Sequence, residues 1–256
     1  MEFQNITLEK QGGIAKLSIN RPPVNVMNCD TIGEISAALE EIAKDDEVKV
    51  LLVRGAGSRA FCAGVEVKDH IGDMVPVMMN AFGEMIKKLR YIGKPSIAVV
   101  NGVALGGGCE LVAGCDMAVA CDKAEFAQPE IKLGGLAPAA AALFPAIMGE
   151  KVAFELILTG DNINAARAEK IGLVNKVVSE EELDSTAEEL ARSFLEKSGL
   201  SLRLIRDAFY QCADAAEFDT AIQIATEQGI KSWETEDAQE GLKSFLEKRP
   251  PIWKNK

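Results

Sequence analysis

Histidine is nearly missing from this sequence, which has one among 256 residues. A Ser–His–Asp triad would have to use His70, and a metal site built from several histidines is excluded. The motifs GxSxG, GxxxxGK[ST], HExxH and GxGxxG are absent as well. Ordinary serine hydrolases, P-loop NTPases, zinc proteases and Rossmann dehydrogenases are therefore disfavoured, and no metal is expected. We expect His70 to be a polar residue near the start of a helix.

Cysteine and long apolar runs are also scarce. Six cysteines are too few for a disulfide scaffold, and Cys109, Cys115 and Cys121 are spaced by six, unlike a CxxC zinc pattern. We expect reduced thiols and a cytoplasmic location. No run of about 20 apolar residues is present, and the first residues lack the basic and apolar regions of a secretory signal. We therefore expect no membrane partner.

Positive charge is in deficit, with 28 Lys and Arg against 39 Asp and Glu and a net charge of −11. An acidic surface repels polyphosphates, which argues against a nucleic-acid partner and against a basic membrane-docking face. The 48% of hydrophobic and 26% of charged residues are ordinary for a folded globular protein. The length allows one large domain or two small ones.

Hydrophobic periodicity predicts a mixed α/β core. Residues 3–8 and 14–19 alternate around Gly12-Gly13, which indicates a hairpin. A helix over 30–43 has Asp30 or Thr31 as its predicted cap. A longer helix over 69–91 has an apolar seam of Met78, Phe82, Met85, Ile86 and Leu89. Further strands are predicted at 48–53, 96–100, 117–120 and 173–178, and further helices at 150–158 and 164–171.

The chain from 179 to 248 has an almost entirely helical pattern, and Pro250 is predicted to end the last helix. A change of composition near 195–200 suggests a boundary there. We therefore divide the chain into a core over 1–197 and a helical C-terminal region over 198–256.

Three segments carry residues suited to chemistry, namely residues 61–66, 101–111 and 125–134. Residues 101–111 read NGVALGGGCEL, follow a predicted strand and open a helix. Glycines at a helix start let unpaired backbone N–H groups approach a ligand, as in an oxyanion hole, although a glycine triplet alone is more typical of a loop. Glu110 and Glu130 are carboxylates in apolar surroundings. A carboxylate in such surroundings is paired with another group, caps a backbone group or has a functional role. Their spacing does not show that they meet.

Four motifs in order, RPPVNVMN, AFCAGVEV, NGVALGGGCEL and FAQPEIKLG, resemble the crotonase superfamily of enoyl-CoA hydratases and isomerases. The C-terminal GLKSFLEKRPP is similar to the end of those proteins. The resemblance implies a spiral of ββα units with a helical C-terminal oligomerisation region, assembled as a homotrimer or a dimer of trimers. It also implies an acyl-CoA thioester substrate and no separate cofactor, since coenzyme A is part of the substrate.

The resemblance further implies a site. The thioester oxygen would lie between the backbone N–H groups of Ala63 and Gly107, and such donors stabilise an enolate-like charge. Glu110 would take a proton from water and Glu130 would give one to the α-carbon, or the two would share these roles. At least one of their pKa values should be raised toward neutrality. Val24, Val65, Gly106 and Lys68 are further candidate contacts for the substrate and its coenzyme A. Lys243 and Lys248 in the last helix are candidate contacts from a neighbouring subunit.

The sequence departs from the family pattern after the third motif. Residues 135–142 read GLAPAAAA where many hydratases have a PGAGG-like stretch, and Glu66 replaces a common Asp. AGVEVKDH with LAPAAAA resembles the hydratases of cyclohexa-1,5-diene-1-carbonyl-CoA in aromatic-acid degradation. The alternatives are a general short-chain enoyl-CoA hydratase, an isomerase or hydrolase on the same scaffold, and a non-enzymatic RNA-associating homologue. Met74, Met78 and Met79 are expected to border the acyl pocket or pack in the core.

Overall fold

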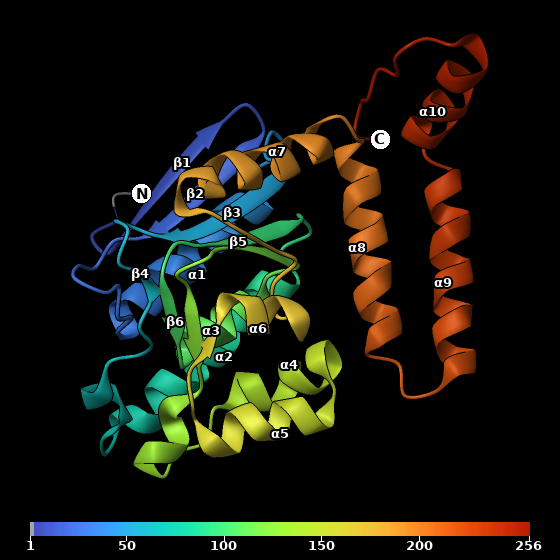
Figure 1. Ribbon diagram of the computed structural model, residues 1–256. Coiled ribbons are helices and arrows are strands. Elements are labelled where there is room, and N and C mark those ends of the chain that lie inside the picture. Colours follow the sequence, from blue (N-terminus) through green and yellow to red (C-terminus); the bar gives the residue numbers. More distant parts are fainter. Residues whose placement is uncertain (1–2) are drawn as a thin grey trace. The chain divides into compact units, whose positions relative to one another are not determined.

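The computed structural model describes residues 3–256 (Figure 1). The chain forms two compact units. The first runs up to Ile92 and continues over Ser96–Ala191, and the second contains Gly93–Pro95 and Arg192–Lys256. The units thus divide at 191/192. The predicted boundary between residues 197 and 198, which would separate an acyl-CoA-binding core from an oligomerisation region, stays a prediction.

The first unit contains a six-stranded sheet of order β1-β2-β3-β5-β7-β10. The predicted hairpin is confirmed, although its first strand lies three residues later than expected, because Ile6 pairs with Ile19 and Gln11 with Ile14. Gly12 and Gly13 both have positive φ, as a two-residue turn of this kind requires. The strands are β1 (Ile6–Gln11), β2 (Ile14–Ile19), β3 (Val50–Gly55), β5 (Ser96–Val100), β7 (Met117–Cys121) and β10 (Lys176–Val178).

From β2 onward the strands of this sheet are parallel, and β5 is buried along its whole length. Burial on both faces explains why β3, β5 and β7 are nearly continuous apolar runs, whereas β2 alternates between buried and half-buried residues. The strand predicted at 173–178 is shorter than expected. Leu173 instead donates its N–H to the carbonyl of Ala168 at the end of the preceding helix, so pairing starts only at Lys176.

A second sheet of four short strands, in the order β4-β6-β8-β9, was not predicted. Its strands are two or three residues long, too short to show alternation: β4 (Ala60–Cys62), β6 (Val103–Leu105), β8 (Glu125–Ala127) and β9 (Ile163–Asn164). Each of β3, β5 and β7 is followed by a strand of this sheet and then by a helical segment. The predicted spiral of ββα units is thereby confirmed. Since β4, β6 and β8 are parallel, their carboxyl ends meet at one edge.

The predicted helices of the first unit are present with shifted ends, whereas the 3-10 turn over Pro129–Leu133 and the helix over Pro138–Met148 had no predicted range. Asn28 caps the first helix by accepting the N–H of Thr31 at 2.9 Å, so the expectation of Asp30 or Thr31 was wrong. The helix predicted at 69–91 is divided by Gly72, whose φ of +58° ends a 3-10 turn. Its apolar seam is buried as predicted. The elements are α1 (Cys29–Ala43), η1 (Val67–His70), α2 (Met74–Arg90), α3 (Gly107–Gly114), η2 (Pro129–Leu133), α4 (Pro138–Met148), α5 (Glu150–Thr159) and α6 (Ala165–Lys170).

The C-terminal part is helical, as predicted, but it is made of separate helices. After the short turn η3 (Glu180–Glu182) come α7 (Leu183–Leu195), α8 (Gly199–Ala213), α9 (Phe218–Trp233) and α10 (Glu236–Glu247). The last helix ends before Pro250, because Lys248 takes the left-handed conformation with φ 55°. Buried Asp237 then holds the final segment by accepting the N–H groups of Lys254 and Asn255. Within residues 3–256, no helix is long and apolar enough to cross a membrane.

Candidate active site

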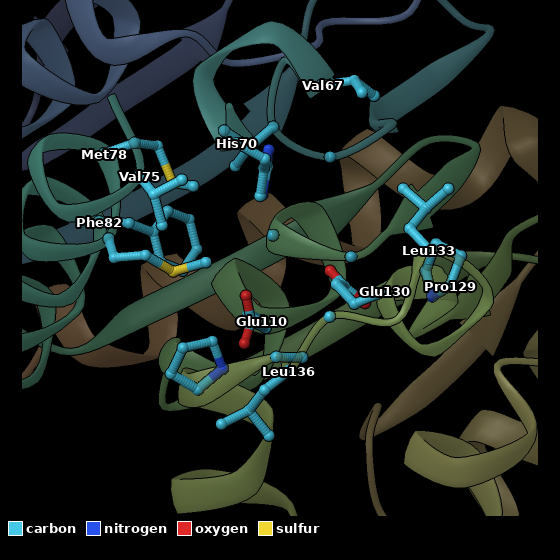
Figure 2. A pocket seen from close by; sticks show the side chains of 18 of the residues that line it. Val67, His70, Val75, Met78, Phe82, Glu110, Pro129, Glu130, Leu133 and Leu136 are labelled. Atoms are coloured by element: carbon cyan, nitrogen blue, oxygen red, sulfur yellow. The ribbon is translucent and has the colours of Figure 1, made fainter. Parts of the chain in front are cut away.

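A cavity of about 550 Å³ opens at the edge where β4, β6 and β8 end. Its walls come from η1, α2, α3, η2 and the start of α4, all within the first unit. Apart from Glu110, Glu130 and His70, its lining residues are apolar, glycine, alanine or proline. Figure 2 shows these three side chains around the same space, while the predicted motifs supply most of the wall.

Glu110 is placed by the first turn of α3 and is 3% exposed. Its Oε1 accepts the N–H of Ala140 at 2.8 Å, in the first turn of α4. Burial raises the pKa of Glu110 to about 7, and the nearby charge of Glu130 acts in the same direction, whereas the Ala140 amide opposes it by stabilising the anion. Glu110 is thus a carboxyl group that can hold or release a proton near neutral pH.

Glu130 comes from η2 and is half-buried. Its carboxylate packs against Gly106, where a Cβ would lie only 2.4 Å from Oε1 of Glu130. Its Oε2 is buried and has no hydrogen-bond partner among the described residues. Burial raises the pKa of Glu130, and the charge of His70 opposes this rise. The structure therefore brings together two carboxyl groups that lie twenty residues apart in the chain.

The two glycine-containing loops also meet at the cavity, but the expected donor of the first loop is already used. The N–H of Ala63 donates to the carbonyl of Val24 at 3.0 Å, so, contrary to expectation, it is not free for a thioester oxygen. The next segment is held through Met27, which donates to Gly64 at 2.9 Å and accepts from Glu66 at 2.7 Å. Between these contacts, the N–H of Val65 makes no hydrogen bond within residues 3–256.

Val65 replaces Ala63 as the candidate donor that faces Gly107. A Cβ on Gly107 would lie 2.8 Å from Cγ2 of Val65, so the two residues are in close contact across the cavity wall. Gly107 is the first residue of α3, where an N–H has no acceptor within the helix. Gly64 has a φ of +107°, which turns the chain between Ala63 and Val65. That backbone reversal is not visible in the spacing of the motif.

The other predicted contacts divide into two groups. Val65 and Gly106 line the cavity. Val24 does not line it, but its carbonyl oxygen accepts the hydrogen bond from the N–H of Ala63. Lys68 lies on η1 outside the lining, with a side chain that is 67% exposed and 3.9 Å from Glu66. Lys243 lies on α10 of the second unit, and Lys248 is the residue that ends this helix rather than part of it. Their contacts with coenzyme A stay predictions.

Sequence reasoning did not include His70 in the site. Its imidazole lines the cavity from η1, and its Nδ1 lies 3.0 Å from the carbonyl oxygen of Glu66. Although His70 is the last residue of the segment AGVEVKDH, neither periodicity nor spacing assigned a role to its imidazole. Of the three methionines expected near the pocket, Met78 and Met79 line it, while Met74 does not.

The contact between Gly106 and Glu130 gives a direct test of the site's geometry. Gly106→Ala is expected to displace the Glu130 carboxylate, since the added Cβ would meet Oε1 at 2.4 Å and the residue has a φ of +51°. Strain of this kind costs about 1–3 kcal/mol, and turnover should fall by at least about tenfold when a reacting group is misplaced. The measurement is kcat/KM beside a thermal melt.

A matched control is Gly83→Ala on α2, where an added Cβ meets nothing within 4 Å. It should keep its activity and gain about 0.5–1 kcal/mol in free energy of unfolding. Equal turnover in Gly106→Ala and the wild type would contradict the placement of Glu130.

Comparison with known proteins agrees with this geometry. Residues 9–256 match the model of the enoyl-CoA hydratase/isomerase family. The short-chain-enoyl-CoA hydratase of Clostridium acetobutylicum is 37% identical over 259 residues, which covers 97% of each chain. The crotonyl-CoA hydratase of Syntrophomonas wolfei is 38% identical over 255 residues, again 97% of each chain. The solved structure of an enoyl-CoA hydratase from Bacillus anthracis superimposes with a TM-score of 0.94 at 30% identity, covering 99% of this chain and 100% of that one. This chain therefore belongs to the enoyl-CoA hydratase/isomerase family.

Proposed function

We propose that this protein is a hydro-lyase that adds water across the α,β-double bond of an acyl-CoA thioester. The observation that carries the proposal is the meeting of buried Glu110 and half-buried Glu130 with two unpaired backbone N–H groups in one apolar cavity. The names of the relatives from Clostridium and Syntrophomonas support the same reaction.

The residues present account for each part of the reaction. The N–H groups of Val65 and Gly107 bind the thioester oxygen and stabilise the negative charge that develops there, each contributing about 3–4 kcal/mol. Glu110 takes a proton from water as the water oxygen bonds to the β-carbon, and Glu130 gives a proton to the α-carbon, or the two share these roles. The reaction changes no oxidation state at the protein, so we propose no cofactor beyond the coenzyme A of the substrate.

The identity of the acyl group is a finer proposal. The segment Leu136–Pro138 lines the cavity together with Met78, Met79 and Phe82. The resemblance of this segment to cyclic dienoyl-CoA hydratases supports cyclohexa-1,5-diene-1-carbonyl-CoA as substrate. The substrate classes in the names of the relatives support short-chain enoyl-CoA instead. Turnover of crotonyl-CoA against the alicyclic dienoyl-CoA decides between them.

The reaction class is tested on the products. The wild-type protein should remove the absorbance of the enoyl thioester and yield a product heavier by one water. Isomerisation would leave the mass unchanged, and thioester hydrolysis would release free coenzyme A. Either of these products in place of the hydrated thioester would contradict the proposal, and so would the absence of turnover on both substrates.

We also propose that the protein acts in the cytoplasm as a homotrimer or a dimer of trimers, in which Lys243 and Lys248 of a neighbouring copy contact the phosphates of coenzyme A. Exposed apolar side chains in the second unit support such an assembly, among them Phe209, Phe218, Trp233 and Phe245. Sedimentation of the purified protein distinguishes these states from a monomer.

A further inference from the structure

His70 is a polar group in the cavity that the proposed reaction does not use. It is the only histidine of the chain, and it lines the cavity together with Glu110 and Glu130. Figure 2 shows its imidazole extending into this space from η1. Among the lining residues of the described chain, it is the one side chain that can carry a positive charge.

The hydrogen bonding of His70 fixes which ring nitrogen titrates. Its Nδ1 lies 3.0 Å from the carbonyl oxygen of Glu66, and a carbonyl oxygen can only accept. Nδ1 therefore carries its hydrogen in both charge states, and Nε2 gains or loses the proton. Buried Asp69 anchors the turn by accepting the N–H of Cys29 at the start of α1, at 3.1 Å.

Of the charged residues near the imidazole, Glu130 and Glu110 are the ones that line the cavity. Just before η1, Glu66 pairs with Arg21 at 3.3 Å, and on η1 the side chain of Lys68 is exposed. The residues of α2 and α4 that line the cavity are uncharged, and Asp73 before α2 is exposed. On η2, Lys132 lies outside the lining and pairs with Asp161 at 3.3 Å.

The ionised form of Glu130 would be stabilised by a nearby positive charge. When ionised it places negative charge in an apolar cavity, and its buried Oε2 has no partner among the described residues. Such an anion is costly unless a hydrogen bond or an opposite charge compensates it. Burial raises the pKa of Glu130, and among its neighbours the charge of His70 works against this rise.

We propose that His70 is a positioning residue for charge, whose protonated imidazole stabilises the carboxylate form of Glu130. This helps Glu130 release its proton to the α-carbon during hydration and hold the charge until it is reprotonated. His70 keeps its own proton throughout, and the proton that Glu110 takes from water restores Glu130 before the next turnover. The inference rests on the proposed function for the identity of that proton transfer, but the coupling between the two side chains does not.

The coupling is tested by NMR without any substrate. Because the chain has a single histidine, the imidazole resonances of the untagged protein titrate as one set. In Glu130→Gln the midpoint of this titration should move to lower pH, because the imidazolium loses its anionic neighbour. Glu125→Gln removes an exposed carboxylate on the adjoining strand β8 and should leave the midpoint unchanged. An unmoved midpoint in Glu130→Gln would overturn the proposal.

The effect on catalysis is tested with His70→Gln, which removes the charge and keeps a polar side chain. The ratio of wild-type to variant kcat/KM should be largest at acidic pH and fall toward one as the pH rises, because only the protonated imidazole carries the charge that the variant lacks. A ratio that does not change with pH would indicate a structural role and overturn the proposal. A wild-type protein with no hydratase turnover would overturn the proposed function instead, and the NMR comparison would still decide the coupling.

Discussion

Replacing either cavity carboxyl group by its amide, as Glu110→Gln or Glu130→Gln, is expected to lower kcat/KM for hydration by about 10²–10⁴-fold, the usual contribution of a general acid or base. Each amide has nearly the shape of the carboxyl group but cannot accept or deliver the proton. Binding should change less, because the thioester oxygen is held by backbone N–H groups that neither substitution touches. The measurement is the initial rate of enoyl-thioester loss over a range of substrate concentrations.

Glu125→Gln is the matched control, since it makes the same chemical change at an exposed position outside the cavity. Its kcat/KM should equal that of the wild type. If both cavity variants kept near-normal turnover, the assignment of acid–base roles to Glu110 and Glu130 would be wrong.

The second large effect is on stability and has the opposite sign. Glu110→Gln is expected to stabilise the protein at pH 8 by up to about 3 kcal/mol in free energy of unfolding. The folded-state pKa of about 7 lies above the ordinary value of 4.5, so the folded protein binds this proton more tightly than the unfolded chain. The wild type therefore loses stability as the pH rises from about 4.5 to about 7, and the neutral amide avoids this loss.

Urea unfolding of both proteins at several pH values tests this prediction. The difference in free energy of unfolding should be full above pH 7 and vanish toward pH 4.5, where both side chains are neutral. The variant amide can still accept the N–H of Ala140, so this contact is kept. A variant that is less stable than the wild type at pH 8 would contradict the burial and raised pKa of Glu110.

The parts of the fold that follow from local patterns could be predicted. The hairpin around Gly12-Gly13 and the buried seam of α2 each depend on a short-range periodicity that the sequence displays. The second sheet could not be predicted in this way, because strands such as β9, with two residues, are defined by their partners and not by their own pattern. Only the resemblance to a family pointed to the spiral arrangement.

The candidate site shows the same division. Motif context identified Glu110, Glu130 and Gly107, and the structure places all three in one cavity. It did not reveal which backbone N–H of the first loop is unpaired. That depends on the pairing of Ala63 with Val24 and on the positive φ of Gly64, which are tertiary and conformational facts.

The most direct test of this account is a crystal structure of Glu110→Gln with crotonyl-CoA bound. We predict the thioester oxygen within hydrogen-bond distance, about 2.7–3.1 Å, of the backbone nitrogens of both Val65 and Gly107. The double bond should then lie between the side chain at position 110 and Glu130. A thioester oxygen bound away from these two nitrogens, or a double bond that reaches neither acidic position, would contradict it.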